Sequence, residues 1–221
     1  MFTGLIRHLG ALESRSSRSG GARVRIAAPR EVLERAMEGA SIAVNGCCLT
    51  AVARDSRAWE ADLSEETLAK TTLGQLKIGS KLHLEPALCV GDPLDGHLML
   101  GHVDAFGALQ ARPAGEGVWR FSMPAELAPL VAEKGSIAVD GVSLTVVDAG
   151  ADYFTVALIP ETVIRTAFAE MRPGDLVNLE ADPLARYAAR LLSTQRSGAK
   201  LSKFAEGGWA AMETWGPDPE V

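Results

Sequence analysis

Short runs of alternating apolar and polar residues, many of them β-branched or aromatic, recur along most of the chain. Examples are RVRIA at 23–27, WEADL at 59–63 and YFTVALI at 153–159, and turn-forming residues separate them. This alternation predicts half-buried β-strands. Asn45-Gly46 and Asp140-Gly141 predict two-residue hairpins, because both central residues of a type I′ turn take a positive φ. Five or six short strands in each half of the chain would form a small closed barrel.

The strand pattern occurs twice. SIAVNGCCLT at 41–50 returns as SIAVDGVSLT at 136–145, and over 41–85 and 136–180 the two copies share 15 of 45 positions without a gap. Among the shared positions are the pairs Leu84-Glu85 and Leu179-Glu180. A unit of about 90 residues is longer than the repeat of a solenoid, so a whole small domain has been duplicated. We expect barrels at 1–97 and 98–183, a helix at 184–198 and a mobile tail at 199–221.

Each copy also carries one predicted short helix. Ser64 is a suitable N-cap for the first, and Pro160 occupies the first turn of the second. Asp182-Pro183 then begins a longer helix, whose apolar positions recur with a helical period. Its stripe either packs on its own barrel or mediates self-association. The stripe consists of Leu184, Tyr187, Ala188, Leu191 and Leu192.

Composition narrows the class of protein. The 221 residues have a net charge of -6 and scattered basic residues, which argues against a partner with a phosphate backbone, so we expect no nucleic acid. No run approaches the roughly 18 apolar residues that span a bilayer, and the N-terminus does not resemble a leader, so we expect a cytoplasmic protein without membrane contact. The three cysteines form no even set, and extended neighbours such as Cys47 and Cys48 face opposite ways, so we expect no disulfide.

Cys48 is the most distinctive candidate for chemistry. Its place just after a tight turn would bring it to a barrel mouth, where side chains meet ligands, although a free cysteine is more often a buried, inert thiol. His97 and His102 are five residues apart and would face opposite sides of a strand, which argues against a zinc site. A single imidazole acting as acid, base or donor remains an alternative to an ordinary surface histidine.

The remaining polar candidates are small hydroxyl side chains at equivalent places in the two copies. Glycine-rich phosphate loops and the GxSxG elbow are missing from the sequence. Hydroxyls and backbone amides suit a neutral, polyhydroxylated heteroaromatic ligand, bound at two barrel mouths. These residues are Ser41, Thr50 and Thr67 in the first copy, and Ser136, Ser143, Thr145 and Thr162 in the second.

Five fragments in order then resemble the riboflavin synthase family: MFTGLI at 1–6, NGCCLT at 45–50, GHLMLGHVD at 96–104, DGVSLT at 140–145 and LIPET at 158–162. The resemblance implies two tandem six-stranded Greek-key β-barrels that bind lumazine, followed by a C-terminal helix that holds a homotrimer together. It also implies a transferase of riboflavin biosynthesis without a cofactor or metal. Two molecules of 6,7-dimethyl-8-ribityllumazine would exchange a four-carbon unit, giving riboflavin and 5-amino-6-(D-ribitylamino)uracil. An association with lumazine synthase is a further hypothesis.

By this resemblance, each site combines the first barrel of one chain with the second barrel of another, and the two lumazines stack. Catalytic roles fall to Cys48, His102, Ser143 and Thr145. The first barrel's pocket would use Gly4, Leu5, Ile6, Ser41, Cys48, Leu49, Thr50, Asp62, Leu63, Ser64, Glu65, Glu66 and Thr67. The second barrel's pocket would use Gly101, His102, Val103, Lys134, Ser143, Leu144, Thr145, Ile159, Pro160, Glu161, Thr162, Val163 and Ile164.

Positioning of the two reactants should contribute more than acid–base help. Holding reactants together is worth up to roughly 7 to 11 kcal/mol, whereas general acid–base catalysis supplies roughly 10² to 10⁴ in rate. The alternative is a lumazine-binding antenna protein, which would bind one chromophore without catalysis. A flavin-binding reductase is a more distant alternative, because the chain lacks a dinucleotide fingerprint. Asp95 stands where family members often have a glycine, which puts the linker between the barrels in doubt.

Overall fold

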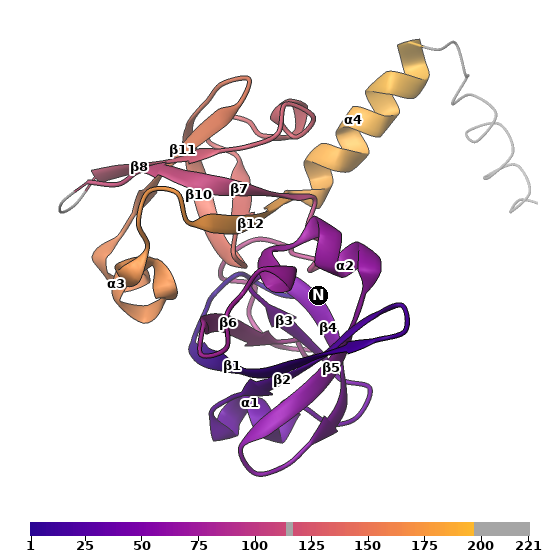
Figure 1. The fold of residues 1–221 in the computed structure, drawn as a ribbon. Coiled ribbons are helices and arrows are strands. Elements are labelled where there is room, and N and C mark those ends of the chain that lie inside the picture. Colours follow the sequence, from indigo (N-terminus) through magenta and orange to yellow (C-terminus); the bar gives the residue numbers. More distant parts are fainter. Residues whose placement is uncertain (114–116, 197–221) are drawn as a thin grey trace, which may run out of the picture. The chain divides into compact units, whose positions relative to one another are not determined.

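The computed structural model describes residues 1–113 and 117–196. Six antiparallel strands close into a first barrel in the order β1-β2-β5-β4-β3-β6, a Greek-key connection (Figure 1). The strands are β1 His8–Arg18, β2 Gly21–Ala27, β3 Ser41–Val44, β4 Cys47–Arg54, β5 Ala58–Ser64 and β6 Lys81–Pro86. Two α-helices and a 3₁₀ turn belong to this half: α1 Arg30–Arg35, α2 Glu65–Lys70 and η1 Thr72–Gly74.

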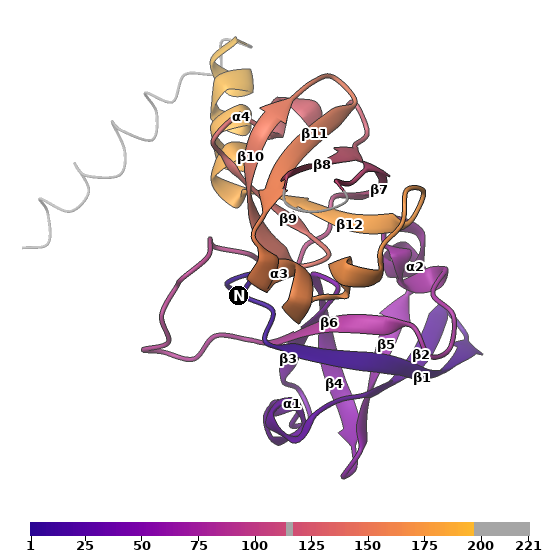
Figure 2. The ribbon, with the colours of Figure 1, turned by 90° about the vertical axis from the view of Figure 1, so that its left-hand side faces the viewer.

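A second barrel repeats the same ring of connections, in the order β10-β11-β8-β7-β12-β9. In two views at right angles its strands form a group separate from β1–β6 (Figure 2). The strands are β7 Ala105–Ala111, β8 Gly117–Ser122, β9 Ser136–Val139, β10 Val142–Ala149, β11 Tyr153–Leu158 and β12 Leu176–Ala181. The helical elements are η2 Ala128–Leu130, α3 Pro160–Arg165, η3 Ala167–Glu170 and α4 Pro183–Arg196. The expected all-β fold with two six-stranded barrels and a C-terminal helix is confirmed.

The local chemistry of turns and caps accounts for these elements. Asn45 and Asp140 both have φ 45, with positive φ at the glycines that follow, as type I′ hairpins require. Ser64 accepts a hydrogen bond from Thr67 N and caps α2, and Pro160 begins α3. The expectation of one short helix per repeat was wrong for the first repeat, which also contains α1. That helix has only six residues, too few for a clear helical period, and it buries Val32 and Leu33.

Large apolar side chains fill each barrel. The core of the first includes the fully buried Trp59 and Ile26, and that of the second includes Phe121 and Phe154. The cavity left among Leu12, Leu49 and their neighbours inside the first barrel is about 10 Å³. That volume holds at most about one water molecule, so a pteridine cannot enter the barrel. Within the described parts of the chain, no helix is long and apolar enough to cross a membrane.

A buried polar cluster joins the two repeats, and equivalent residues of the two repeats make equivalent hydrogen bonds in it. Asn45 Oδ1 accepts a hydrogen bond from His83 N at 2.8 Å, and the equivalent Asp140 Oδ1 accepts one from Asn178 N at 2.8 Å. The side chains of His83 on β6 and Asn178 on β12 each form a hydrogen bond with the other repeat. Asn178 Nδ2 donates to Asn45 O, and His83 Nδ1 lies 2.8 Å from Asp140 O. An imidazole and an amide therefore perform the same bridging role at equivalent positions.

Burial shifts two of these groups in opposite directions. It lowers the pKa of His83 to about 4, and the bond with Asp140 O opposes this. His83 Nε2 accepts a hydrogen bond from Ala167 N, so the neutral ring carries its proton on Nδ1. Burial raises the pKa of the Asp140 carboxyl to about 7, against the hydrogen bond from Asn178. At neutral pH the cluster therefore contains a neutral imidazole and a carboxyl close to its titration point.

Replacing each titrating group by its counterpart in the other repeat separates the titration of Asp140 from that of His83. The counterpart of Asp140 is Asn45, and that of His83 is Asn178. Between pH of about 4 and 7 the folded chain holds a proton on Asp140 that the unfolded chain has lost, so this group makes stability fall as pH rises. Asp140→Asn should therefore gain stability relative to wild type as pH rises through that range. His83→Asn should gain stability relative to wild type as pH falls from about 6.5 to 4, because in that range the imidazole of the unfolded wild-type chain binds a proton and the buried imidazole does not. Urea unfolding at a series of pH values measures both differences, and differences that do not change with pH would contradict the assignment.

Candidate functional site

The candidate residues of the first barrel lie on its outer wall. β3 pairs with β4 so that Ser41 is opposite Thr50 and Ala43 is opposite Cys48. Leu49, between the two candidates on β4, is buried in the barrel core, whereas Thr50 is exposed and Cys48 half-buried. Because side chains alternate along a strand, Cys48 and Thr50 point away from the interior. The expected barrel-mouth location is thus corrected to the outward face, and Leu49 offers only its backbone to a ligand there.

The neighbouring strand β5 and helix α2 extend this face. Asp62 and Ser64 are exposed, while Leu63 between them is buried in the core. Ser64 Oγ lies 3.0 Å from Thr67 Oγ1, so the two hydroxyls form a pair at the start of α2, and Glu65 and Glu66 beside them are exposed. Asp62 accepts two hydrogen bonds of 2.7 Å from the Arg23 guanidinium, which lowers the pKa of that carboxyl.

The second barrel presents an equivalent but more apolar face. β9 pairs with β10 so that Ser136 is opposite Thr145 and Ala138 is opposite Ser143, and Leu144 between the two candidates is buried in the core. Lys134 adopts φ 63 in the preceding turn, and its side chain is exposed. The segment from 159 to 164 carries two largely exposed isoleucines, and Pro160 and Glu161 are exposed as well, with Thr162 and Val163 partly buried. The isoleucines, Ile159 and Ile164, are 63% and 74% exposed.

The segments that precede each barrel cross over to the other one. Ser143 N donates to Gly4 O at 2.9 Å, and Cys48 N donates to Gly101 O at 2.9 Å. Ile6 is buried in the core of the second barrel, and Val103 packs against the core of the first. The expected assignment of residues 4–6 to the first barrel's pocket, and of residues 101–103 to the second barrel's pocket, is therefore corrected. Gly4 and Ile6 lie with the second barrel's candidates, and Gly101 and Val103 lie with those of the first barrel.

Gly4 and Gly101 are the residues that allow these crossings. Their φ values are +79 and +77, in the region that side chains rarely adopt. A Cβ on Gly4 would lie 2.6 Å from Ser143 Cβ, and one on Gly101 would lie 2.5 Å from Cys48 Cβ. Only glycine brings the backbone this close to Cys48 and Ser143.

Two buried glutamates anchor the crossing segments. Glu85 Oε1 accepts hydrogen bonds of 2.7 Å from both Thr3 N and Thr3 Oγ1, and Oε2 accepts one from Gly4 N at 3.0 Å. Glu180 accepts hydrogen bonds from Leu100 N and Gly101 N at 2.9 and 3.1 Å. Burial raises the pKa of Glu180, and hydrogen bonds from the backbone of residues 100–102 oppose this. The Leu-Glu pairs repeat in the sequence, but their pattern does not indicate this anchoring role.

The thiols and His102 differ in their surroundings. Cys47 is buried in the core, and burial raises the pKa of its thiol to about 12, so it is inert at neutral pH. Cys48 packs beside the small cluster that Phe2 and Met99 form between the repeats. His102 follows Gly101 and is exposed. In the parts of the chain that the structure describes, no group of three or more His, Cys, Asp or Glu could hold a metal ion.

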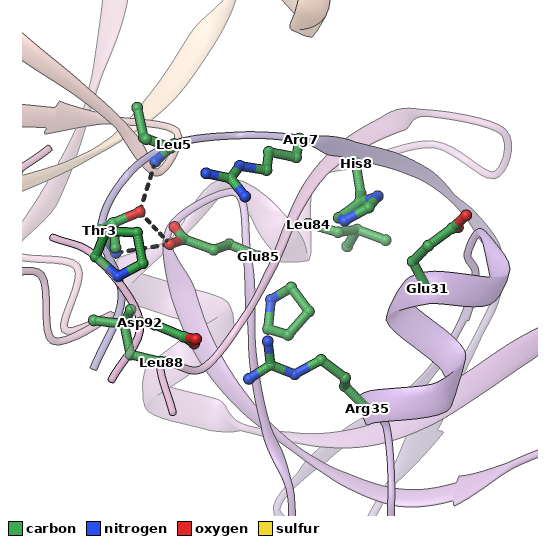
Figure 3. A pocket seen from close by; sticks show the side chains of 12 residues that line it. Thr3, Leu5, Arg7, His8, Glu31, Arg35, Leu84, Glu85, Leu88 and Asp92 are labelled. Atoms are coloured by element: carbon green, nitrogen blue, oxygen red, sulfur yellow. Dashed lines mark hydrogen bonds between the residues drawn. The ribbon is translucent and has the colours of Figure 1, made fainter. Parts of the chain in front are cut away.

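A cavity of about 300 Å³ lies beside the N-terminal segment, next to the Thr3–Glu85 hydrogen bonds (Figure 3). Leu5 is the only predicted site residue in its lining, which otherwise mixes basic and acidic side chains such as Arg35 and Glu31. The cavity is therefore distinct from the outer faces that carry Cys48 and Ser143.

Comparison with known proteins agrees with this double architecture. The family model described as the lumazine binding domain matches twice, over residues 3–87 and 100–182. A riboflavin synthase of Mycobacterium tuberculosis is 44% identical over 198 residues, which are 87% of this chain and 98% of that protein. The chain belongs to the riboflavin synthase family. A second riboflavin synthase, from Photobacterium phosphoreum, is 37% identical over 207 residues, 92% of this chain and 94% of the relative.

Solved structures agree with the fold of this riboflavin synthase family member. LumP in complex with riboflavin superimposes with a TM-score of 0.75 at 23% identity, over 82% of this chain and 99% of LumP. LumP in complex with 6,7-dimethyl-8-(1'-D-ribityl) lumazine gives 0.73 at 22% identity, with the same coverage. At this identity the likeness establishes the fold alone, and the family assignment rests on the closer relatives.

Proposed function

We propose that this chain is a riboflavin synthase, a transferase that converts two molecules of 6,7-dimethyl-8-ribityllumazine into riboflavin and 5-amino-6-(D-ribitylamino)uracil. The observation that carries the proposal is the duplicated pair of outer faces, each with a crossing glycine segment, in a chain 44% identical to a riboflavin synthase over most of its length. Two equivalent faces suit a reaction that uses the same substrate twice. The products together contain the atoms of the two substrates, so no external oxidant or reductant is needed.

Each face binds one lumazine in this proposal. On the first face, Ser41, Thr50 and the Ser64–Thr67 pair offer hydroxyls to a ribityl chain and ring oxygens. On the second, Thr145 and Lys134 offer polar contacts, and the exposed isoleucines cover an aromatic ring. Cys48 and His102 act near the reacting carbons, in nucleophile or proton handling. Holding the two rings together supplies the larger part of the rate, up to roughly 7 to 11 kcal/mol.

The reacting pair requires two faces to meet, and we infer that they come from different chains of a homotrimer. Leu184, Tyr187, Leu191 and Leu192 on α4 support this, because they form an apolar stripe in which every side chain is at least half exposed. The trimer is proposed to work in the cytoplasm. A contact with lumazine synthase would shorten the path of the substrate, and it remains part of the proposal.

Product formation without any cofactor tests the proposed activity. Purified protein mixed with 6,7-dimethyl-8-ribityllumazine alone should produce riboflavin absorbance, with one riboflavin and one pyrimidine for every two lumazines consumed. Chromatography of the reaction measures this ratio, and protein inactivated by heat is the control. Protein that changes the fluorescence of the lumazine but never forms riboflavin would be a chromophore-binding protein instead.

A further inference from the structure

His97 lies against a candidate residue of the second face. Its Nδ1 is 2.7 Å from Ser143 Oγ, and His97 as a whole is 9% exposed. Gly96 allows this approach, because a Cβ there would lie 2.0 Å from Thr3 O and 3.0 Å from Ser143 Cβ. The pair thus forms where the segment between the barrels passes over β10.

The other ring nitrogen decides where the proton of His97 resides. His97 Nε2 is buried without a hydrogen-bond partner. If Nδ1 accepted from the serine, Nε2 would bear an N–H with no acceptor, and orphaned buried N–H groups are rare. With the proton on Nδ1, only a lone pair is left without a partner. Burial lowers the pKa of His97, with the charge of Asp182 acting in the opposite direction, which favours the neutral ring.

The hydroxyl proton of Ser143 then points away from His97. The Ser143 Oγ accepts a hydrogen bond from His97 Nδ1, and the Ser143 backbone N–H donates to Gly4 O. The side chain is half-buried, on the outward face of β10. Ser143 O–H is therefore available as a donor toward whatever lies on that face.

The equivalent place in the first repeat holds a different group. Cys48 corresponds to Ser143, and a thiol is a weaker hydrogen-bond donor than a hydroxyl. The two faces thus differ in their ability to stabilise negative charge, although their backbones are related by the repeat.

We propose that His97 is a positioning residue that makes Ser143 a hydrogen-bond donor to the lumazine on the second barrel. The donor acts when the C7 methyl of that lumazine has lost a proton to solvent, and the electron pair of the carbanion has spread into the pteridine ring. No bond to Ser143 or His97 forms, and neither residue transfers its own proton. This inference rests on the proposed function and assigns a chemical difference between the two faces.

Substitutions at both positions test the pairing. His97→Leu removes the donor to Ser143 Oγ, and we expect kcat to fall about 100-fold, at the lower end of the roughly 10² to 10³ range for the loss of one donor to a developing anion, with KM changed less than threefold. Ser143→Ala should lose a similar factor, and the double variant should be no worse than Ser143→Ala. His97→Asn, whose amide can replace Nδ1–H, should recover most of the rate, whereas His97→Gln, whose amide reaches the Nε2 position, should not.

The bound substrate supplies a second readout that does not depend on turnover. The pKa of the C7 methyl of bound 6,7-dimethyl-8-ribityllumazine, followed by absorbance during a pH titration, should be higher in His97→Leu than in wild type and in His97→Asn. Additive losses in the double variant, or equal lumazine pKa values in all variants, would overturn the proposal. If wild-type protein itself forms no riboflavin, the proposed function fails, and the titration of bound lumazine still decides the role of His97. Should His97→Leu not fold, the comparison of Asn and Gln decides it.

Discussion

A chain that carries Gly101→Ala is expected to lose at least about 100-fold in riboflavin formation, because a displacement of about 1 Å at reacting groups has an effect of that size. The new methyl group would lie 2.5 Å from Cys48 Cβ and 2.8 Å from Cys48 N, on backbone with φ +77. Residues 101–103 must then move off the first barrel, and the hydrogen bond from Cys48 N to Gly101 O is lost. His102 moves with them, so one face loses both its crossing segment and a proposed catalytic group.

Gly174→Ala is the matched control for this variant. Gly174 also has a positive φ, of +99, but nothing lies within 4 Å of its Cβ position. It therefore reports the cost of backbone strain alone, about 1 kcal/mol or more in the free energy of unfolding. Activity assays and urea unfolding of both variants separate the effects. If the two variants lost activity equally, the close approach to Cys48 would have no special role.

The part of the fold that follows from short-range chemistry was predictable from the sequence. Asn45-Gly46 and Asp140-Gly141 specify their hairpins because few dipeptides tolerate two positive φ values. Ser64 and Pro160 mark helix starts for equally local reasons. Since these signals occur twice in one register, the duplication and the two barrels could be inferred together.

The arrangement of the site could not be read in the same way. The alternation of side chains along a strand places Cys48 and Leu49 on opposite faces of the sheet. It does not indicate which segment of the chain covers the outward face. The crossing of residues 4–6 and 101–103 depends on contacts between positions more than 50 apart, such as Gly4 with Ser143. No signal in the sequence marks this exchange, so the grouping implied by the resemblance places each fragment with its own barrel.

The buried carboxylates show a similar limit. Glu85 and Glu180 stand at the ends of alternating strands, where a glutamate would ordinarily face water. Their identity in both repeats was visible, but their partners are backbone amides, which every residue except proline possesses. A repeated charged residue at a strand end was the one available signal, and it indicated importance without naming a role.

Chains with the double substitution Leu191→Glu and Leu192→Glu are expected to fold but to form almost no riboflavin. Both leucines are at least half exposed on α4, and in the proposed trimer their stripe packs against the same stripe of two other chains. Burying glutamates there without partners costs several kcal/mol, so the trimer should dissociate. Sedimentation velocity would then report monomers. Ser193→Glu is the control, because Ser193 lies two and a half turns from Leu184, on the opposite side of the helix.

Loss of activity on dissociation would fit a site shared between chains, but a monomer could also fail for other reasons, and subunit mixing separates these cases. Gly101→Ala damages the first face and leaves the second intact, whereas Gly4→Ala does the reverse, because its new Cβ would meet Ser143. If faces from different chains form each site, chains of the two inactive variants refolded together should regain about a quarter of wild-type activity, since random assembly in a symmetric trimer pairs two intact faces that often. If each chain contained a complete site, every site in the mixture would carry one damaged face and no activity would return. A monomeric double variant with full activity would contradict the shared site directly.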